Sequence, residues 1–442
     1  MTLSSPNKEA PHHVLWQLAL ALALTSAVSL GLARFSYALI LPPMRADLGW
    51  TYFLSGAMNT ANALGYLAGA LMSRRWLARF DAWPVLMVGG AGAVLTLLAH
   101  GLWVPDRTVA MVAATQALSS QHNAWLAVVR FSGGVASAAM FVAGGLLAAR
   151  LATRATRSAG AGTASRSGLI LGIYYGGTGL GIVLSAALVP WVSGWATPHA
   201  WRWAWFGLGV LALLALLTTA RLMAGERGDF LAAPEVSRPA ANITLPVNNR
   251  GFPWRDFWPS LAGYFCFGLG YIGYMTFVIT LLREQQLSAH LVVVFFTLLG
   301  VGVMASSWLW AGLLQRHRNG RPMMQLNGLL ALATVLPVLS VHPLAVLASG
   351  VLFGSVFLSV VASTTALVRH NLPEPLWTAG IAAYTIVFAI GQIMGPSVVG
   401  WVADGPGGLL RGFLVSAGVL ALGAGAAARQ SEIRKKDPLF KQ

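Results

Sequence analysis

Apolar residues in this chain gather in runs that are long enough to cross a lipid bilayer, and most charged residues lie between those runs. A helix of about 20 predominantly apolar residues spans the hydrocarbon core, whereas the strands of a membrane barrel alternate over about ten residues. The pattern therefore predicts an all-α polytopic membrane protein. We expect twelve transmembrane helices, at residues 14–43, 52–72, 83–103, 124–149, 168–193, 201–222, 258–282, 291–314, 323–341, 344–368, 377–402 and 408–428.

The stretch 108–149 holds a single charge, Arg130, and could form one span or two. Residues 116–123 are polar enough to be a loop. Basic residues of short loops concentrate on the cytoplasmic side of a membrane. With twelve spans, the basic loops at 74–79 and 150–166 fall on the same side, so we expect 104–123 to be an outer loop, which could include a short surface helix. The same rule predicts that both termini are cytoplasmic.

Residues 223–257 mark a boundary, because they combine mixed charge with prolines at positions 234, 239, 246 and 253. We expect a cytoplasmic linker here, between a six-helix N-terminal half (1–222) and a six-helix C-terminal half with a basic tail (258–442). The halves also show an internal repeat, since GLARFSY at 31–37 matches GLGYIGY at 268–274. Parallel repeats with a substrate path at their interface are an established transporter plan.

Composition narrows the function classes. The chain is 56% hydrophobic and 10% charged, against about 25% charged residues in soluble domains. Its net charge of +16 comes from short loops rather than from one basic patch, so we expect no nucleic-acid partner. Cys266 is the single cysteine, which excludes an intramolecular disulfide and a cysteine metal cluster. We predict no metal and no cofactor. Lys8 and Glu9 precede an apolar run that is too long for a cleavable signal.

Several local patterns carry a family resemblance. A glycine precedes basic residues after the second and eighth spans, Arg130-Phe-Ser-Gly-Gly lies in the fourth span, and Gly-Gln-Ile-Met-Gly-Pro lies at 391–396 in the eleventh. The chain thus resembles the major facilitator superfamily and is similar to its bacterial YbfB/YjiJ-type subgroup over nearly all of its length. The resemblance implies alternating access in the bacterial inner (plasma) membrane. It implies gating or coupling roles for Arg130, Gly69, Arg74, Arg75, Gly312, Arg316, Gly391, Gly395 and Pro396.

The chain also departs from that superfamily. Ser73 stands where the basic loop after the second span usually carries an aspartate, and the basic loop at 316–321 also lacks an acid. The charge contact that latches the inward-closed state in this superfamily is therefore not predicted. For Arg130 a role in packing and hydrogen bonding stays open beside the coupling role, and the glycines permit close helix approach and bending.

Arg34 is the main candidate for substrate binding. It is the one charged residue between His13 and Arg45, and an arginine inside a membrane helix costs about 2.5–3.5 kcal/mol on insertion scales. Arginine eight residues before Pro42 looks similar to organophosphate:phosphate exchangers of the same superfamily, where it contacts substrate phosphate. Tyr271 occupies the repeat-related position where those exchangers have a second arginine, which favours a solute with one acidic group. Alternatively, Arg34 is structural and bonds to neighbouring helices.

Polar side chains of other spans complete the predicted site. Tyr37 lies on the face of Arg34, and the same spacing recurs in the seventh span. Such groups could orient a small solute, or they could join helices at about 0.6 kcal/mol each. The predicted substrate-binding residues are Arg34, Tyr37, Asn59, Asn62, Tyr271, Tyr274, Tyr384 and Gln392.

We therefore expect a secondary active or facilitative transporter of a small organic solute, with an organic anion favoured. Its expected partners are the solute and the lipid bilayer, and we expect it to be monomeric. All 13 acids lie in loops, tails or span ends, so exchange or facilitated transport is as plausible as proton symport. An exporter of neutral amphiphilic compounds and a transporter-like ligand sensor without net flux stay open. No nucleophile, metal cluster or acid pair suggests an enzyme.

Overall fold

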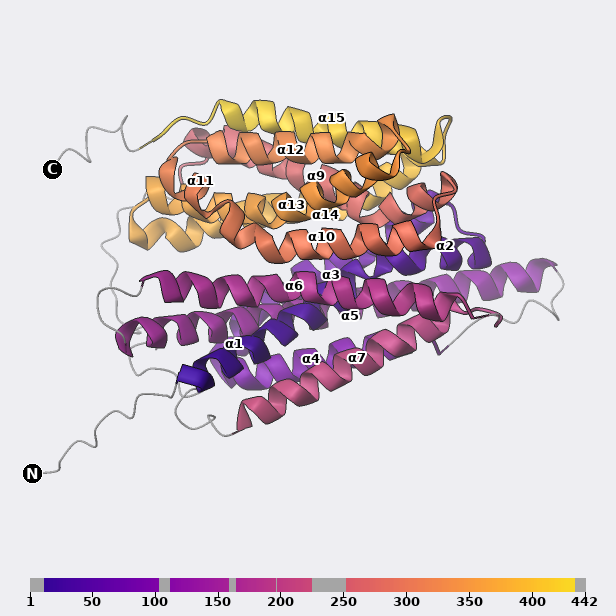
Figure 1. Cartoon of the computed structure of the whole chain (residues 1–442), viewed down its shortest axis with the longest axis horizontal. Coiled ribbons are helices and arrows are strands. Elements are labelled where there is room, and N and C mark those ends of the chain that lie inside the picture. The colour runs from indigo at the N-terminus through magenta and orange to yellow at the C-terminus, as the bar shows by residue number, and fades with distance from the viewer. Residues whose placement is uncertain (1–11, 103–111, 159–163, 196, 225–251, 434–442) are drawn as a thin grey trace, which may run out of the picture.

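The computed structural model describes residues 12–102, 112–158, 164–195, 197–224 and 252–433. Within these ranges the chain is helical and has no strand, which confirms the predicted all-α class. Figure 1 shows the long helices running side by side along the longest axis of the molecule.

The helices follow the predicted order closely. The first is a continuous rod of α1 (His12–Ser26), the π-helix η1 (Ala27–Phe35) and α2 (Tyr37–Leu48). The others are α3 (Tyr52–Phe80), α4 (Ala82–Ala99), α5 (Val112–Ser158), α6 (Ala164–Ser193), α7 (Trp201–Leu222), α9 (Trp254–Glu284), α10 (Ala289–Leu309), α11 (Ala311–Arg316), α12 (Arg321–Leu339), α13 (Pro343–Asn371), the 3-10 turn η4 (Glu374–Leu376), α14 (Trp377–Ala403) and α15 (Gly408–Ala428).

Eleven helical stretches of the described residues are long and apolar enough to cross a membrane. The remaining predicted span is α3, which is 29 residues long but carries Asn59, Thr60 and Asn62 along its length. The protein is therefore a multi-pass membrane protein, and α3 is its most polar long helix.

The segment 104–123, expected as an outer loop that could include a short helix, is helical in its second part. The helix α5 begins at Val112, so residues 112–123 continue the helix beyond the predicted span. This segment contains no glycine or proline that would stop a helix, and a polar composition does not by itself end one. Residues 103–111, and most of the predicted linker (225–251), lie outside the described residues.

A tight turn sets the first two helices antiparallel. Gly49 adopts a positive φ of 68°, and its N–H donates to the carbonyl of Arg45 at the end of α2. Two residues later, Thr51 caps α3 by accepting a hydrogen bond from the N–H of Leu54 at 3.1 Å. The turn brings the start of α3 beside the end of α2.

The helices α1 to α7 are called the N-terminal helices below, and α9 to α15 the C-terminal helices. Across the two sets, α3 packs against α14, α6 against α10, and α2 against α9. The distal end is where α2 ends and α3 begins, and the proximal end is where α1 begins and α15 ends (Figure 1).

Two glycines bring the backbones of α3 and α14 into contact near the distal end. A Cβ atom on Gly56 would overlap the carbonyl of Pro396, and one on Gly400 would overlap the carbonyl of Tyr52. Small residues at membrane helix interfaces allow such close approach. The distal contact therefore depends on the absence of side chains at these two positions.

Substitution of Gly56 by alanine should lower the melting temperature of the purified protein, because the added methyl group must push α3 from α14 at a cost of about 1–3 kcal/mol. The matched control is Gly418→Ala in α15, where a Cβ atom meets nothing within 4 Å. Thermal unfolding in detergent compares the two variants. Equal melting temperatures would show that the α3–α14 contact is not tight.

Candidate substrate site

Arg34 lies in the π-helical segment of the first rod. The N–H of Ser36 donates to the carbonyl of Gly31 at 3.1 Å, the five-residue spacing of a π-helix. Segments of this kind occur often at functional sites. The segment is buried along its whole length, and Arg34 itself is 5% exposed.

The guanidinium of Arg34 contacts a helix of the other set. Gln392 on α14 faces Arg34, and with its amide assigned so that the oxygen points toward the guanidinium it accepts hydrogen bonds from Nη1 at 3.1 Å and from Nη2. Tyr66 on α3 lies beneath the guanidinium, with its ring centroid 4.9 Å from Cζ. The Nε atom of Arg34 is buried and has no partner. Both partners of this cation are therefore neutral.

Arg130 is a second buried guanidinium and is 2% exposed. Its Nη2 donates to the Asn59 side-chain oxygen at 3.1 Å, and its Nε donates to the carbonyl of Met58 at 3.3 Å. The ring of Tyr37 lies 4.2 Å from its Cζ. The amide nitrogen of Asn59 then donates to Thr276 Oγ1 on α9 at 2.7 Å. Arg130 is thus connected through Asn59 to the C-terminal helices.

No carboxylate pairs with either buried arginine among the described residues. The ion pairs between described residues include Arg45–Glu284, Arg150–Asp81, His199–Asp47 and Arg318–Glu432. Arg34 and Arg130 lie close enough to repel each other electrostatically. The centre of the bundle therefore holds positive charge that only neutral dipoles and aromatic faces offset.

The predicted tyrosines take different places. Tyr271 stacks on Phe267, Phe388 and Phe357, with centroids 4.7, 5.7 and 6.0 Å away, and Phe357 meets Phe35 of η1 edge-on at 5.7 Å. These five rings are called the aromatic cluster below. It lies next to the segment that carries Arg34.

The hydroxyl groups of three other predicted residues are engaged within their own sets of helices. Tyr37 donates to the carbonyl of Ser55 at 2.9 Å. Tyr274 bonds to Ser349 at 2.7 Å, and Tyr384 bonds to Ser260. The predicted Asn62 donates to the carbonyl of Arg130 at 3.0 Å.

Two residues outside the predicted substrate-binding set lie near the buried arginines: Tyr66 contacts Arg34, and Thr276 bonds to Asn59, the partner of Arg130. The sequence does not single out Thr276, because its hydrogen-bond partner Asn59 lies far away in the chain, in the other set of helices. Tyr66 falls seven residues after Asn59 and so shares its helix face. This spacing is the feature of the sequence that could identify Tyr66 as part of the site. His100, near a predicted span end, is 3% exposed and stacks on Trp205 at 4.2 Å.

The distal end carries a separate set of contacts between the two sets of helices. Asp404, just after α14, accepts from the backbone N–H groups of Tyr52 and Phe53 at 2.7 and 2.9 Å. Glu284, at the end of α9, accepts from the Tyr52 hydroxyl and pairs with Arg45 at 3.5 Å. These contacts join the two sets of helices at this end.

Some of the predicted gating residues are closely packed against a neighbouring helix, and the others are exposed. A Cβ atom at Gly69, Gly391 or Gly395 would overlap a neighbouring helix, and Pro396 meets Gly56, whereas Gly312 faces open space. Arg74, Arg75 and Arg316 are exposed, and none of them forms an ion pair with a described residue. Acids from elsewhere serve the basic loops, because Asp81 bonds to Arg150 at 3.0 Å and Glu432 lies 3.7 Å from Arg318.

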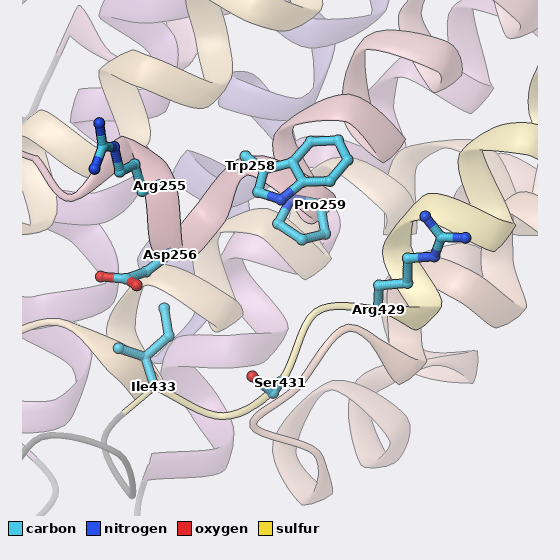
Figure 2. A pocket seen from close by; sticks show the side chains of 7 residues that line it. All are labelled: Arg255, Asp256, Trp258, Pro259, Arg429, Ser431 and Ile433. Atoms are coloured by element: carbon cyan, nitrogen blue, oxygen red, sulfur yellow. The ribbon is translucent and has the colours of Figure 1, made fainter.

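A pocket of about 380 Å³ opens at the proximal end, apart from Arg34. Figure 2 shows Arg255 at the start of α9 and Arg429 after α15 on opposite sides of it, with Trp258 and Pro259 between them. Asp256 also lines this pocket, so it is less suited to an anion than the Arg34 region. No group of three His, Cys, Asp or Glu side chains in the described residues could hold a metal ion.

Comparison with known proteins gives a family and a fold. Residues 26–428 match the sequence model of a family described as the uncharacterised MFS-type transporter YbfB. No curated protein matches the sequence significantly. These findings confirm the resemblance predicted from the motifs.

Solved transporter structures share the fold. A mutant of the nucleoside transporter NupG has a TM-score of 0.67 at 13% identity, covering 94% of this chain and 99% of its own. A bacterial homologue of the human lysosomal transporter Spinster gives 0.64 at 13% identity, covering 95% and 96%. The xylose transporter XylE from E. coli gives 0.62 at 12%, covering 93% and 97%. The comparisons point to a membrane transporter and not to an enzyme.

Substitution of Thr276 by valine should destabilise the protein by about 1–3 kcal/mol, because it leaves the buried Asn59 amide without an acceptor. The matched control is Thr334→Val. Thr334 is equally buried and bonds only to the carbonyl of Leu330 in its own helix. Thermal unfolding of both variants checks the difference. A control that loses as much stability as Thr276→Val would argue against the contact between the helix sets.

Proposed function

Because the chain belongs to the YbfB-type family of the major facilitator superfamily and is a membrane transporter, we propose that it moves a small organic solute with a single acidic group. Arg34 binds that acid. The observation that carries the proposal is the pair of buried guanidiniums without a carboxylate partner in the described residues.

An acidic solute fits Arg34 for chemical reasons. The planar guanidinium matches a carboxylate with two parallel hydrogen bonds, and such charge-assisted bonds are about twice as strong as neutral ones. In a medium of low dielectric, the arriving negative charge also offsets the repulsion between Arg34 and Arg130. A neutral solute gains neither effect, so the site favours an anion.

The aromatic cluster supports an apolar body on the same solute. Its rings lie beside η1, and stacked aromatic faces accommodate flat or aliphatic groups without demanding hydrogen bonds. The cluster also favours the second candidate function, export of neutral amphiphilic compounds, in which Arg34 would be structural. At 12–13% identity, the nucleoside and xylose in the names of the structural neighbours carry no weight for this chain.

Transport is proposed to follow alternating access, as a monomer in the bacterial inner membrane, with both termini in the cytoplasm. The N-terminal and C-terminal helices rock about the Arg34 region. In this orientation the distal end faces outward, and the contacts of Asp404 and Glu284 close the outer entrance. Flux of a bound solute into proteoliposomes separates this function from a ligand sensor without flux.

A thermal-shift screen of carboxylates, phosphates and neutral metabolites should find monocarboxylates that raise the melting temperature. A ligand at 100 times its Kd adds about 2.7 kcal/mol of stability. The shift should vanish in Arg34→Ala and shrink in Arg34→Lys, because lysine offers a point charge instead of a fork. Arg45→Ala is the control, since Arg45 lies at the distal end and pairs with Glu284. Ligands that stabilise wild type and Arg34→Ala equally would sink the anion proposal.

A further inference from the structure

We infer that Gln392 is an internal ligand of Arg34, which the acid of the solute replaces, and that this exchange releases α14 from η1 as the solute binds. The inference rests on the proposed function, because it names the group that competes with the solute. It assigns one guanidinium two successive partners, first an amide of the protein and then a carboxylate.

The geometry makes the two partners mutually exclusive. The Gln392 oxygen accepts from both Nη1 and Nη2 of Arg34, and these are two nitrogens that a carboxylate can engage with its two oxygens. Gln392 is 4% exposed and Arg34 is 5% exposed, so the edge they share is closed to other groups. An acid that binds this edge must therefore displace the amide.

The position of Gln392 is fixed by its neighbours on α14. Gly391 and Gly395 pack directly on the backbone of α9, at Phe265 and Leu269 respectively. The helix α14 packs on α9 at these glycines and also packs on α3, and its Gln392 side chain reaches across to Arg34 of the N-terminal helices. A change of partner at Arg34 therefore alters a contact between the two sets of helices.

Gln392 is also at one end of a row of contacts along α14. From Gln392 toward the distal end, Thr60 bonds to the carbonyl of Ile393 and to Ser397, and Asp404 bonds to the start of α3. No hydrogen bond or ion pair between two described residues joins α14 to the N-terminal helices on the proximal side of Gln392. When Gln392 leaves Arg34, this series of contacts between α14 and the N-terminal helices therefore loses its proximal member.

The exchange discriminates among solutes. Leaving the amide costs Arg34 two hydrogen bonds to a neutral acceptor, and a carboxylate restores them as stronger charged bonds. A neutral solute restores at most two hydrogen bonds of the strength that Arg34 made with the Gln392 amide. The competition with Gln392 therefore adds selectivity for an acid to the binding site.

Affinities of three variants test the competition. Wild type, Gln392→Ala, Gln392→Glu and Thr60→Val are titrated by thermal shift with acetate to hexanoate and benzoate, and the monocarboxylate that stabilises wild type most is compared. Gln392→Ala should bind it at least threefold more tightly, because its competitor is gone. Gln392→Glu should bind at least tenfold more weakly, because its own carboxylate occupies Arg34. Thr60→Val, which breaks a neighbouring contact of α14 without touching Arg34, should stay within twofold of wild type.

Weaker or unchanged binding by Gln392→Ala would overturn the inference, since Gln392 would then contact the solute or serve packing alone. A gain in Thr60→Val equal to that in Gln392→Ala would also overturn it, because loosening of the helices in general would explain both.

A cycle without solute tests the internal contact by itself. If Arg34 and Gln392 are partners, the melting temperature of the double alanine variant falls no further than that of the worse single variant. Additive falls would exclude the contact whatever the solute. A wild type that no monocarboxylate stabilises would contradict the proposed function and the competition with it, while the cycle still decides whether Gln392 binds Arg34.

Discussion

The burial of two guanidinium groups between membrane helices is the constraint on which the central packing depends. A charge in a medium of low dielectric requires nearby acceptors, and no carboxylate of the described residues pairs with either guanidinium. Arg34 obtains an amide oxygen from α14, and Arg130 obtains one from α3. The amide nitrogen of Asn59 then needs an acceptor of its own and finds Thr276 on α9. The need to satisfy two cations thus brings five elements into register: η1, α3, α5, α9 and α14.

The contacts between the two sets of helices differ in kind along the bundle. At the distal end, Asp404 accepts two backbone N–H groups at the first turn of α3, where a carboxylate is also favoured by the helix dipole. The Arg45–Glu284 pair beside it is partly exposed, and pairs of this sort contribute about 0–1 kcal/mol. In the centre, the contacts between the sets are hydrogen bonds without a carboxylate, from Arg34 to the Gln392 amide and from Asn59 to Thr276. Such bonds have a small net value because they are readily exchanged for others, and this suits a region where a solute is to bind.

The sequence was sufficient for most of the fold because membrane helices leave a strong signal. Length, apolar composition and the placement of basic loops predict most long helices within a few residues, although α3 and α5 continue eight and nine residues past their predicted ends. Another exception is the start of α5 at Val112, where polar residues 116–123 indicated a loop. A helix that leaves the membrane needs no apolar residues, so hydropathy ends before the helix does. The π-helical turn at Arg34 also left no signal, since it arises from backbone packing and not from composition.

Several residues of the candidate site were identified from the sequence, but the contacts between them were not. Arg34, Asn59 and Gln392 were all identified as polar residues inside spans. Their pairing depends on which helix faces which across the two sets, and a single sequence does not contain that information. Tyr66 was visible by its spacing from Asn59, whereas Thr276 was hidden for the same reason as the pairs.

The ion pairs that form near the two basic loops join residues of the same set of helices. Asp81 bonds to Arg150 within the N-terminal helices, and Glu432 lies near Arg318 within the C-terminal ones. Both pairs join elements of the same set, so they stiffen each set without connecting the two. Apart from the Arg45–Glu284 pair at the distal end, the ion pairs described above lie within one set, and the central contacts between the sets involve no carboxylate. Motion of one set against the other therefore breaks none of these ion pairs at the centre. The unpaired charge of Arg34 then remains as the strongest electrostatic demand on that interface, and an acidic solute is the group best able to meet it.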